Sequence, residues 1–229
     1  MAKRQSYVTH RDRNLLKFVA RYRAATEAIL RRALFGESAK RANVHRVVRR
    51  LVRQGLLQQV AIAPGQKYVV LAKRGYRVLN MSARRPRPLT EQSLPSVLAI
   101  AWFCVRTGVT RFTDLEFRQR YPELWKAGLR SSAYYLAQTP QGLKLGMFLV
   151  DRGGTPRRLK GKIRRLITQR ASLPAFAALI AAKRFQITVL TGLPAQQRHL
   201  RRQLKRRFFK CVEVEIALIL ELGELLTLK

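Results

Sequence analysis

Acidic residues are scarce in this chain of 229 residues. Asp and Glu together number 12 against 47 Lys and Arg, which gives a formal net charge of +35. A charge of this size predicts a polyanionic partner, of which nucleic acid is the commonest. Because apolar residues still make up 47% of the chain, the composition favours a globular protein over a disordered basic tail.

Cysteine and histidine are also rare. The two cysteines, Cys104 and Cys211, lie in apolar sequence and form neither a disulfide framework nor a zinc-binding spacing. The three histidines are scattered at positions 10, 45 and 199, so their spacing does not predict a metal site built on histidine. We therefore expect no cofactor.

Long apolar segments are missing as well. The longest one, residues 94–105, is shorter than the about 20 apolar residues that a transmembrane helix requires. The N-terminal sequence MAKRQSYVTHRDR lacks the apolar core of a signal peptide. These absences predict a cytoplasmic protein without a membrane partner.

Residues 38–57, SAKRANVHRVVRRLVRQGLL, combine five arginines and a lysine with an apolar period. The apolar residues at the spacing of one helical face are Val44, Val47, Val48, Leu51 and Val52. Ser38 is placed to cap this helix, and Gly55 to follow it in the left-handed conformation. No acid occurs between Glu37 and Glu91, so the cationic face repels itself unless a polyanion neutralises it. We favour nucleic-acid contact over a merely solvated face.

The elements around this helix predict a DNA-binding domain over residues 1–81. Helices at 10–22 and 26–34 precede it, and two strands, LLQQVAIA and KYVVLA, follow it around Pro64-Gly65. A short helix, KRGYRVLNM, completes the order, which is that of a winged helix-turn-helix domain. In that fold the third helix enters the major groove of DNA and the wing touches the phosphate backbone.

The candidate DNA contacts follow from this fold. Residues in the first turns of the third helix are expected at base edges: Lys40, Arg41, Asn43 and His45. Later residues are expected at flanking phosphates: Arg46, Arg49, Arg50 and Arg53. Gln66 and Lys67 would act from the wing.

The stretches THRDRNLLKFVARYRAATEAILRRALF, RRLVRQGLL and PGQKYVVLAKRGYRVL resemble the N-terminal domain of the replication-relaxation family. The matching positions are Arg11, Asp12, Leu15, Leu16, Tyr22, Arg23, Leu34, Arg50, Leu51, Gly55, Leu56, Leu57, Tyr68, Leu71, Gly75 and Leu79. The resemblance implies a winged-helix protein of a plasmid or other mobile element. Its implied partners are proteins of replication, relaxosome assembly in conjugation, or transcription.

A second, α/β domain is predicted over residues 94–229, after a basic linker at 82–93. The linker, SARRPRPLTEQS, contains two prolines, and its Arg84 and Arg85 are expected to follow a phosphate backbone. A buried helix at 94–107 precedes alternating strands and helices, which predict a mixed sheet. The fold class expected for the whole chain is therefore α+β, a winged helix-turn-helix followed by an α/β domain.

The segment MFLVDRGGTPRRLKGKIRRL resembles the restriction-endonuclease-like core of the same family. Asp151, Arg152, Gly153, Thr155 and Lys162 match its pattern. This implies a metal-dependent nuclease centred on Asp151 and Lys162. Such an enzyme needs two or three carboxylates around the metal. Here Leu149 stands at the glutamate position, and Asp151 is the only acid between Glu123 and Glu213. We therefore expect a nuclease-like fold without enzymatic activity.

Residues 152–210 carry 17 basic residues and no acid, which predicts a second cationic surface. It is expected to hold the DNA backbone without reading bases. The candidate residues are Arg157, Arg158, Lys160, Arg164, Arg165, Arg201, Arg202 and Lys205.

The sequence favours a duplex-DNA-binding accessory or regulatory protein. Two alternatives stay open: a metal-dependent DNA nuclease, and an RNA- or ribosome-associated basic protein. The terminal segment VEVEIALILELGELLTL suits either a last core strand or a dimer interface. Because winged helices often dimerise to read two half-sites, we favour a homodimer.

Overall fold

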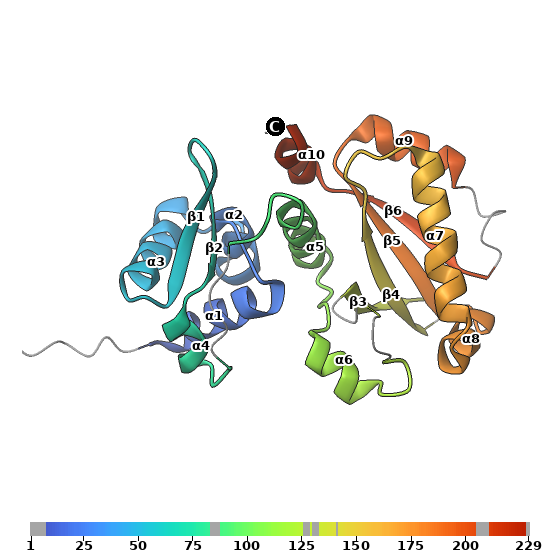
Figure 1. The fold of residues 1–229 in the computed structure, drawn as a ribbon. Coiled ribbons are helices and arrows are strands. Elements are labelled where there is room, and N and C mark those ends of the chain that lie inside the picture. Colours follow the sequence, from blue (N-terminus) through green and yellow to red (C-terminus); the bar gives the residue numbers. More distant parts are fainter. Residues whose placement is uncertain are drawn as a thin grey trace, which may run out of the picture. The chain divides into compact units, whose positions relative to one another are not determined.

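The computed structural model of the chain describes residues 8–82, 88–125, 129, 133–140, 142–204 and 211–227 (Figure 1). Two compact units form, Met1–Ala101 and Trp102–Lys229. Helices and two β-sheets are combined in the chain, so the predicted α+β class is confirmed. Among the described residues, none of the helices has the length and apolar character needed to span a bilayer.

Three helical segments open the N-terminal unit, as the apolar period predicts. Thr9 and Asp12 form a capping box at the start of the first helix, and Thr26 caps the second. The second helix continues into a π-helical turn. The bounds are α1 (His10–Tyr22), α2 (Glu27–Leu30), η1 (Arg31–Phe35) and α3 (Arg41–Arg53).

The start of α3 differs from the prediction. Ser38 is not its cap, because Ser38 lies in a turn closed by the hydrogen bond from Ala39 N–H to the Gly36 carbonyl, 3.2 Å. The helix instead begins after Lys40, whose side chain makes no capping hydrogen bond. Gly55 follows α3 in the left-handed conformation, φ +67°, as predicted.

A β-hairpin and a short helix complete the described part of this unit's core. Strands β1 (Leu57–Ala63) and β2 (Gln66–Leu71) pair antiparallel. Ala25 adds a bridge to Val69 of β2, with backbone hydrogen bonds of 2.9 and 3.1 Å. Helix α4 (Lys73–Val78) packs closely on the start of the hairpin, since a Cβ on Gly75 would lie 2.3 Å from the Leu56 carbonyl oxygen.

The predicted linker ends in an ordered turn. Residues 83–87, which include Arg84 and Arg85, lie outside the described residues. Beyond them, Leu89 N–H donates to the Tyr68 hydroxyl, 3.0 Å, and Thr90 caps a turn at Ser93. Helix α5 (Leu94–Thr107) follows at once, with the predicted bounds, and the boundary between the two units falls inside it.

The C-terminal unit contains a four-stranded mixed sheet, as predicted. The strand order is β3-β4-β5-β6; β3 pairs antiparallel with β4, and the other pairs are parallel. The strands are β3 (Tyr134–Thr139), β4 (Gly142–Val150), β5 (Phe185–Thr191) and β6 (Glu213–Leu218). The predicted helices between them are α7 (Pro156–Ala171), α8 (Pro174–Ala181) and α9 (Pro194–Gln203).

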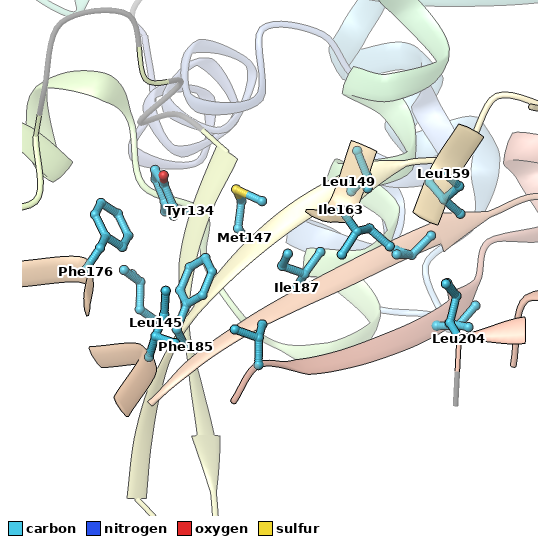
Figure 2. Close-up of a cluster of buried hydrophobic side chains, with 14 of the residues drawn as sticks. Tyr134, Leu145, Met147, Leu149, Leu159, Ile163, Phe176, Phe185, Ile187 and Leu204 are labelled. Atoms are coloured by element: carbon cyan, nitrogen blue, oxygen red, sulfur yellow. The ribbon is translucent and has the colours of Figure 1, made fainter. Parts of the chain in front are cut away.

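Alternate side chains of the strands divide between the two faces of this sheet. On one face, Leu149 of β4 and Ile187 of β5 pack with Leu159 and Ile163 of α7 in one apolar cluster (Figure 2). On the other face, the Phe103 ring of α5 lies 5.4 Å from the Phe148 ring, edge to face. The position where the family resemblance expects a glutamate, Leu149, is therefore a core position.

Two short helices were not predicted. Helix α6 (Asp114–Arg120) is capped by a box of Thr113 and Glu116. Helix α10 (Leu220–Thr227) follows β6. The terminal segment, predicted as a last core strand or a dimer interface, forms the edge strand β6 followed by a helix, and the dimer interface stays a prediction.

Candidate nucleic-acid interface

The outward face of α3 is a stripe of arginines. At about 100° per residue, Arg46, Arg49 and Arg53 fall opposite the buried Val44 and Leu51. All three arginines are exposed, and none forms a side-chain hydrogen bond or ion pair with another described residue. This arginine stripe therefore exposes three guanidinium groups that have no acidic partner among the described residues.

Arg50, on one flank of the stripe, is held against α1 by an ion pair, and its side chain stays 35% exposed. Its Nη2 lies 2.5 Å from Oδ1 of Asp12, a carboxylate that is only 1% exposed. Asp12 also accepts the Thr9 N–H at 3.0 Å. Burial alone would raise the pKa of Asp12, but the hydrogen bonds from Arg50 and Thr9 outweigh it and set the pKa below its ordinary value. Arg50, predicted as a phosphate ligand, already has an anionic partner.

His45, on the other flank, contacts the second helix. Its Nδ1 lies 2.9 Å from Oε1 of Glu27, the first residue of α2. The residue predicted to reach base edges therefore faces Glu27. Sequence spacing did not show either flank contact, because the partners lie 18 and 38 positions away.

The remaining candidates of this unit are exposed. Lys40, Arg41 and Asn43 lie at the start of α3, and Gln66 and Lys67 lie at the start of β2, next to the hairpin turn. Helix α3 contacts β1 of the same hairpin, so helix and hairpin form one body.

Helix α7 carries the second cationic face. Leu159 and Ile163 point into the sheet, and Arg157, Arg164 and Arg165 are exposed on the opposite side. None of these three arginines pairs with another described residue. Arg158 is also exposed, whereas Lys160 is partly buried.

Helix α9 extends this face but divides its arginines between two roles. Arg198 and Arg202 are exposed on the side away from the buried Leu200. Arg201 donates to the Ile216 carbonyl of β6 at 3.3 Å, and Gln197 donates to the same oxygen at 3.2 Å. Because β6 is an edge strand, these two side chains satisfy an unpaired backbone acceptor. Lys205 lies outside the described residues.

Arg170 shows that basic sequence is not always surface. Its side chain is 2% exposed, and its Nε donates to the Tyr134 hydroxyl at 2.7 Å. The guanidinium also lies over the rings of Tyr134 and Phe176, at 5.4 and 5.9 Å from their centroids. Burial raises the pKa of Tyr134, and Arg170 partly opposes that rise. Arg170 is thus a core residue among the 17 basic residues of this segment.

Asp151, the centre of the alternative nuclease site, holds a loop together. It is 5% exposed; Oδ1 accepts the N–H groups of Gly153 and Gly154, and Oδ2 accepts Gln196 Nε2, all at 3.2 Å. Lys162 is exposed on α7. Within the described ranges, no three His, Cys, Asp or Glu side chains gather as metal ligands. The carboxylate oxygens of Asp151 are occupied by protein donors.

Most acids of this unit's C-terminal segment are also paired. Glu213 of β6 lies 2.8 Å from Lys144, and Glu221 of α10 accepts two hydrogen bonds from Arg106 at 2.5 and 2.7 Å. Glu215 accepts the Thr188 hydroxyl at 3.0 Å. These acids lie on β6 and α10 rather than on α7 or α9, so they leave the cationic face unneutralised.

Comparison with protein-family models, curated proteins and solved structures finds no match to this chain. The interpretation of the two cationic faces therefore rests on the geometry of the residues themselves.

Proposed function

We propose that this chain is a duplex-DNA-binding accessory or regulatory protein of a plasmid or other mobile element, acting in replication, conjugation or transcription control. The observation that carries DNA binding is the arginine stripe on α3. Arg46, Arg49 and Arg53 are exposed and unpaired in the described part of the chain, whereas the neighbouring Arg50 and His45 face acids. Like charges this close cost stability, and a row of phosphates would remove that cost.

We assign the N-terminal unit to the winged helix-turn-helix class. The support is the order of three helices followed by a hairpin, with Ala25 joining β2 to the segment between α1 and α2. In this class α3 enters the major groove and the turn at Gly65 touches the backbone. The mobile-element role rests on the sequence resemblance alone.

The C-terminal unit is assigned the role of holding phosphates. Helices α7 and α9 expose arginines on one side of the sheet. Two glutamines of α9 that could read bases are instead hydrogen-bonded within the unit, Gln196 to Asp151 and Gln197 to the Ile216 carbonyl. We propose a degenerate restriction-endonuclease-like fold for this unit. The nuclease alternative is disfavoured because Leu149 is buried in the core and Asp151 is bound by Gly153, Gly154 and Gln196.

A binding experiment with three nucleic acids tests the proposal. Fluorescence anisotropy compares a duplex DNA, its single strand and a structured RNA hairpin of equal length, with and without Mg²⁺. We expect the tightest binding to the duplex, no cleavage, and a steep fall of affinity with salt. Preferred binding to the hairpin would favour the RNA alternative, and Mg²⁺-dependent cleavage would establish a nuclease. Sedimentation of the free and bound protein tests the proposed homodimer.

A further inference from the structure

We propose that Asp12 and Arg50 are positioning residues that fix the orientation of the arginine stripe. Recognition of the DNA sequence then depends on a carboxylate that does not itself contact DNA. The inference rests on the proposed function, because it concerns how α3 would read a duplex. It assigns Arg50 a different role from its neighbours Arg49 and Arg53.

The first argument is geometric. Asp12 is fixed by the capping box at the start of α1, where its Oδ2 accepts the Thr9 N–H. Its other oxygen, Oδ1, accepts a hydrogen bond from Arg50 of α3, which holds this part of α3 against α1. On the opposite flank, His45 contacts Glu27 of α2. Two polar contacts, one to each neighbouring helix, thus resist rotation of α3 about its own axis.

The second argument is the size of the displacement that a loosened helix would allow. Side chains extend about 6 Å from a helix axis, so a rotation of about 30° moves their ends by about 3 Å. Neighbouring base pairs are about 3.4 Å apart, so such a rotation would offset Arg46 by almost one base pair. Phosphates can be reached from many orientations, whereas base edges require fixed geometry.

The third argument is charge. Asp12 neutralises Arg50 inside the unit, so Arg50 adds little to the release of counterions from DNA. Arg53, three positions later on the same helix, is exposed and has no described partner. Substitutions of Arg50 and Arg53 can therefore be compared directly, because the two arginines lie on the same helix and differ in whether an acid neutralises them.

The test uses the full chain, which first selects its preferred duplex from a pool of randomised 20-base-pair DNA. Fluorescence anisotropy then measures the affinity for this enriched duplex and for a random-sequence duplex over a range of NaCl concentrations. Circular dichroism measures the folded fraction of each variant. Asp12→Asn, which keeps an oxygen for Thr9, is expected to weaken the enriched duplex about tenfold more than the random one. Its salt slope should not fall below the wild-type value, because Arg50 keeps its charge and loses its carboxylate partner. Arg53→Gln should instead lower the slope by about 0.9 and weaken both duplexes alike.

Arg50 supplies a second route if Asp12→Asn does not fold. Arg50→Gln should lose specificity with an unchanged salt slope, and Arg50→Lys, which can still pair with Asp12, should retain most of it. The inference is overturned if Arg50→Gln lowers the slope as Arg53→Gln does, or if both duplexes weaken equally. Wild-type protein that binds duplex without enriching any sequence overturns the inference alone, and wild-type protein that binds no duplex overturns the proposed function.

Discussion

Helix α3 of the N-terminal unit and helix α7 of the C-terminal unit carry similar charge but are held in different ways. Both have a buried apolar side and exposed arginines opposite it, three on α3 and four on α7. The flanks of α3 are fixed by Asp12 and Glu27, acids from two other helices. By contrast, α7 is joined to strand β3 by a contact deep in the core, the hydrogen bond from Arg170 to Tyr134. Under the proposed function, α3 is therefore the helix whose orientation allows it to recognise bases, and α7 binds the DNA backbone with less selectivity.

The largest expected effect comes from removing each stripe in turn. Replacing Arg46, Arg49 and Arg53 together by Gln should lower the salt slope by about 2.7 and weaken the preferred duplex at least a hundredfold. The same change at Arg157, Arg164 and Arg165 should lower the slope similarly but weaken all duplexes alike. Salt titrations of both triple variants check this, and equal selectivity losses would remove the distinction between the helices.

Gly75→Ala should separate the stabilities of the two units. A Cβ at this position meets the Leu56 carbonyl oxygen at 2.3 Å, so α4 must move away from the hairpin. Such overpacking costs about 1–3 kcal/mol. Thermal unfolding should show the loss in the N-terminal unit, while the near-ultraviolet signal of Trp102 and Trp125 changes little. A matched Gly161→Ala on the exposed side of α7, where a Cβ meets nothing within 4 Å, should not destabilise the protein.

Asp151→Asn tests whether the carboxylate of the C-terminal unit is structural. Gly153, Gly154 and Gln196 all donate hydrogen bonds to the two carboxylate oxygens of Asp151. An asparagine has only one such oxygen, and its NH₂ group would face a donor in place of the other. We therefore expect a stability loss of about 1 kcal/mol. DNA affinity should be unchanged. Wild-type protein should not cleave DNA with Mg²⁺ or Mn²⁺; metal-dependent nicking that disappears in Asp151→Asn would make the protein an enzyme.

The smallest expected effect is the pH dependence that Asp12 contributes. Its pKa in the folded chain lies below the ordinary aspartate value of 3.8, so the carboxylate stabilises the N-terminal unit fully above that pH. The contribution is lost as the pH falls through the lower, folded-state pKa. Denaturant unfolding between pH 5 and 2.5 should show this loss, and Asp12→Asn should flatten it. An unchanged profile in the variant would show that other carboxylates dominate.

Long periodic segments were predictable from the sequence. The bounds of α1 and α5 agree with the prediction. Helix α1 buries one face over 13 residues, whereas α5 is apolar and buried on nearly all sides from residue 94 to residue 104. The strands of the mixed sheet follow from alternating or continuous apolar runs. Helices α6 and α10 were missed, since 7 and 8 residues hold too few periods to stand out from neighbouring strands.

By itself the sequence determined where the charge lies and which helix faces are apolar, because both properties repeat locally. The tertiary structure decided which charges remain available. Arg50 meets Asp12 across 38 positions, Arg201 meets a carbonyl of β6, and Arg170 enters an aromatic core, although each reads as a surface arginine in its own helix. Such pairings depend on which elements pack together, and local spacing carries no record of that packing.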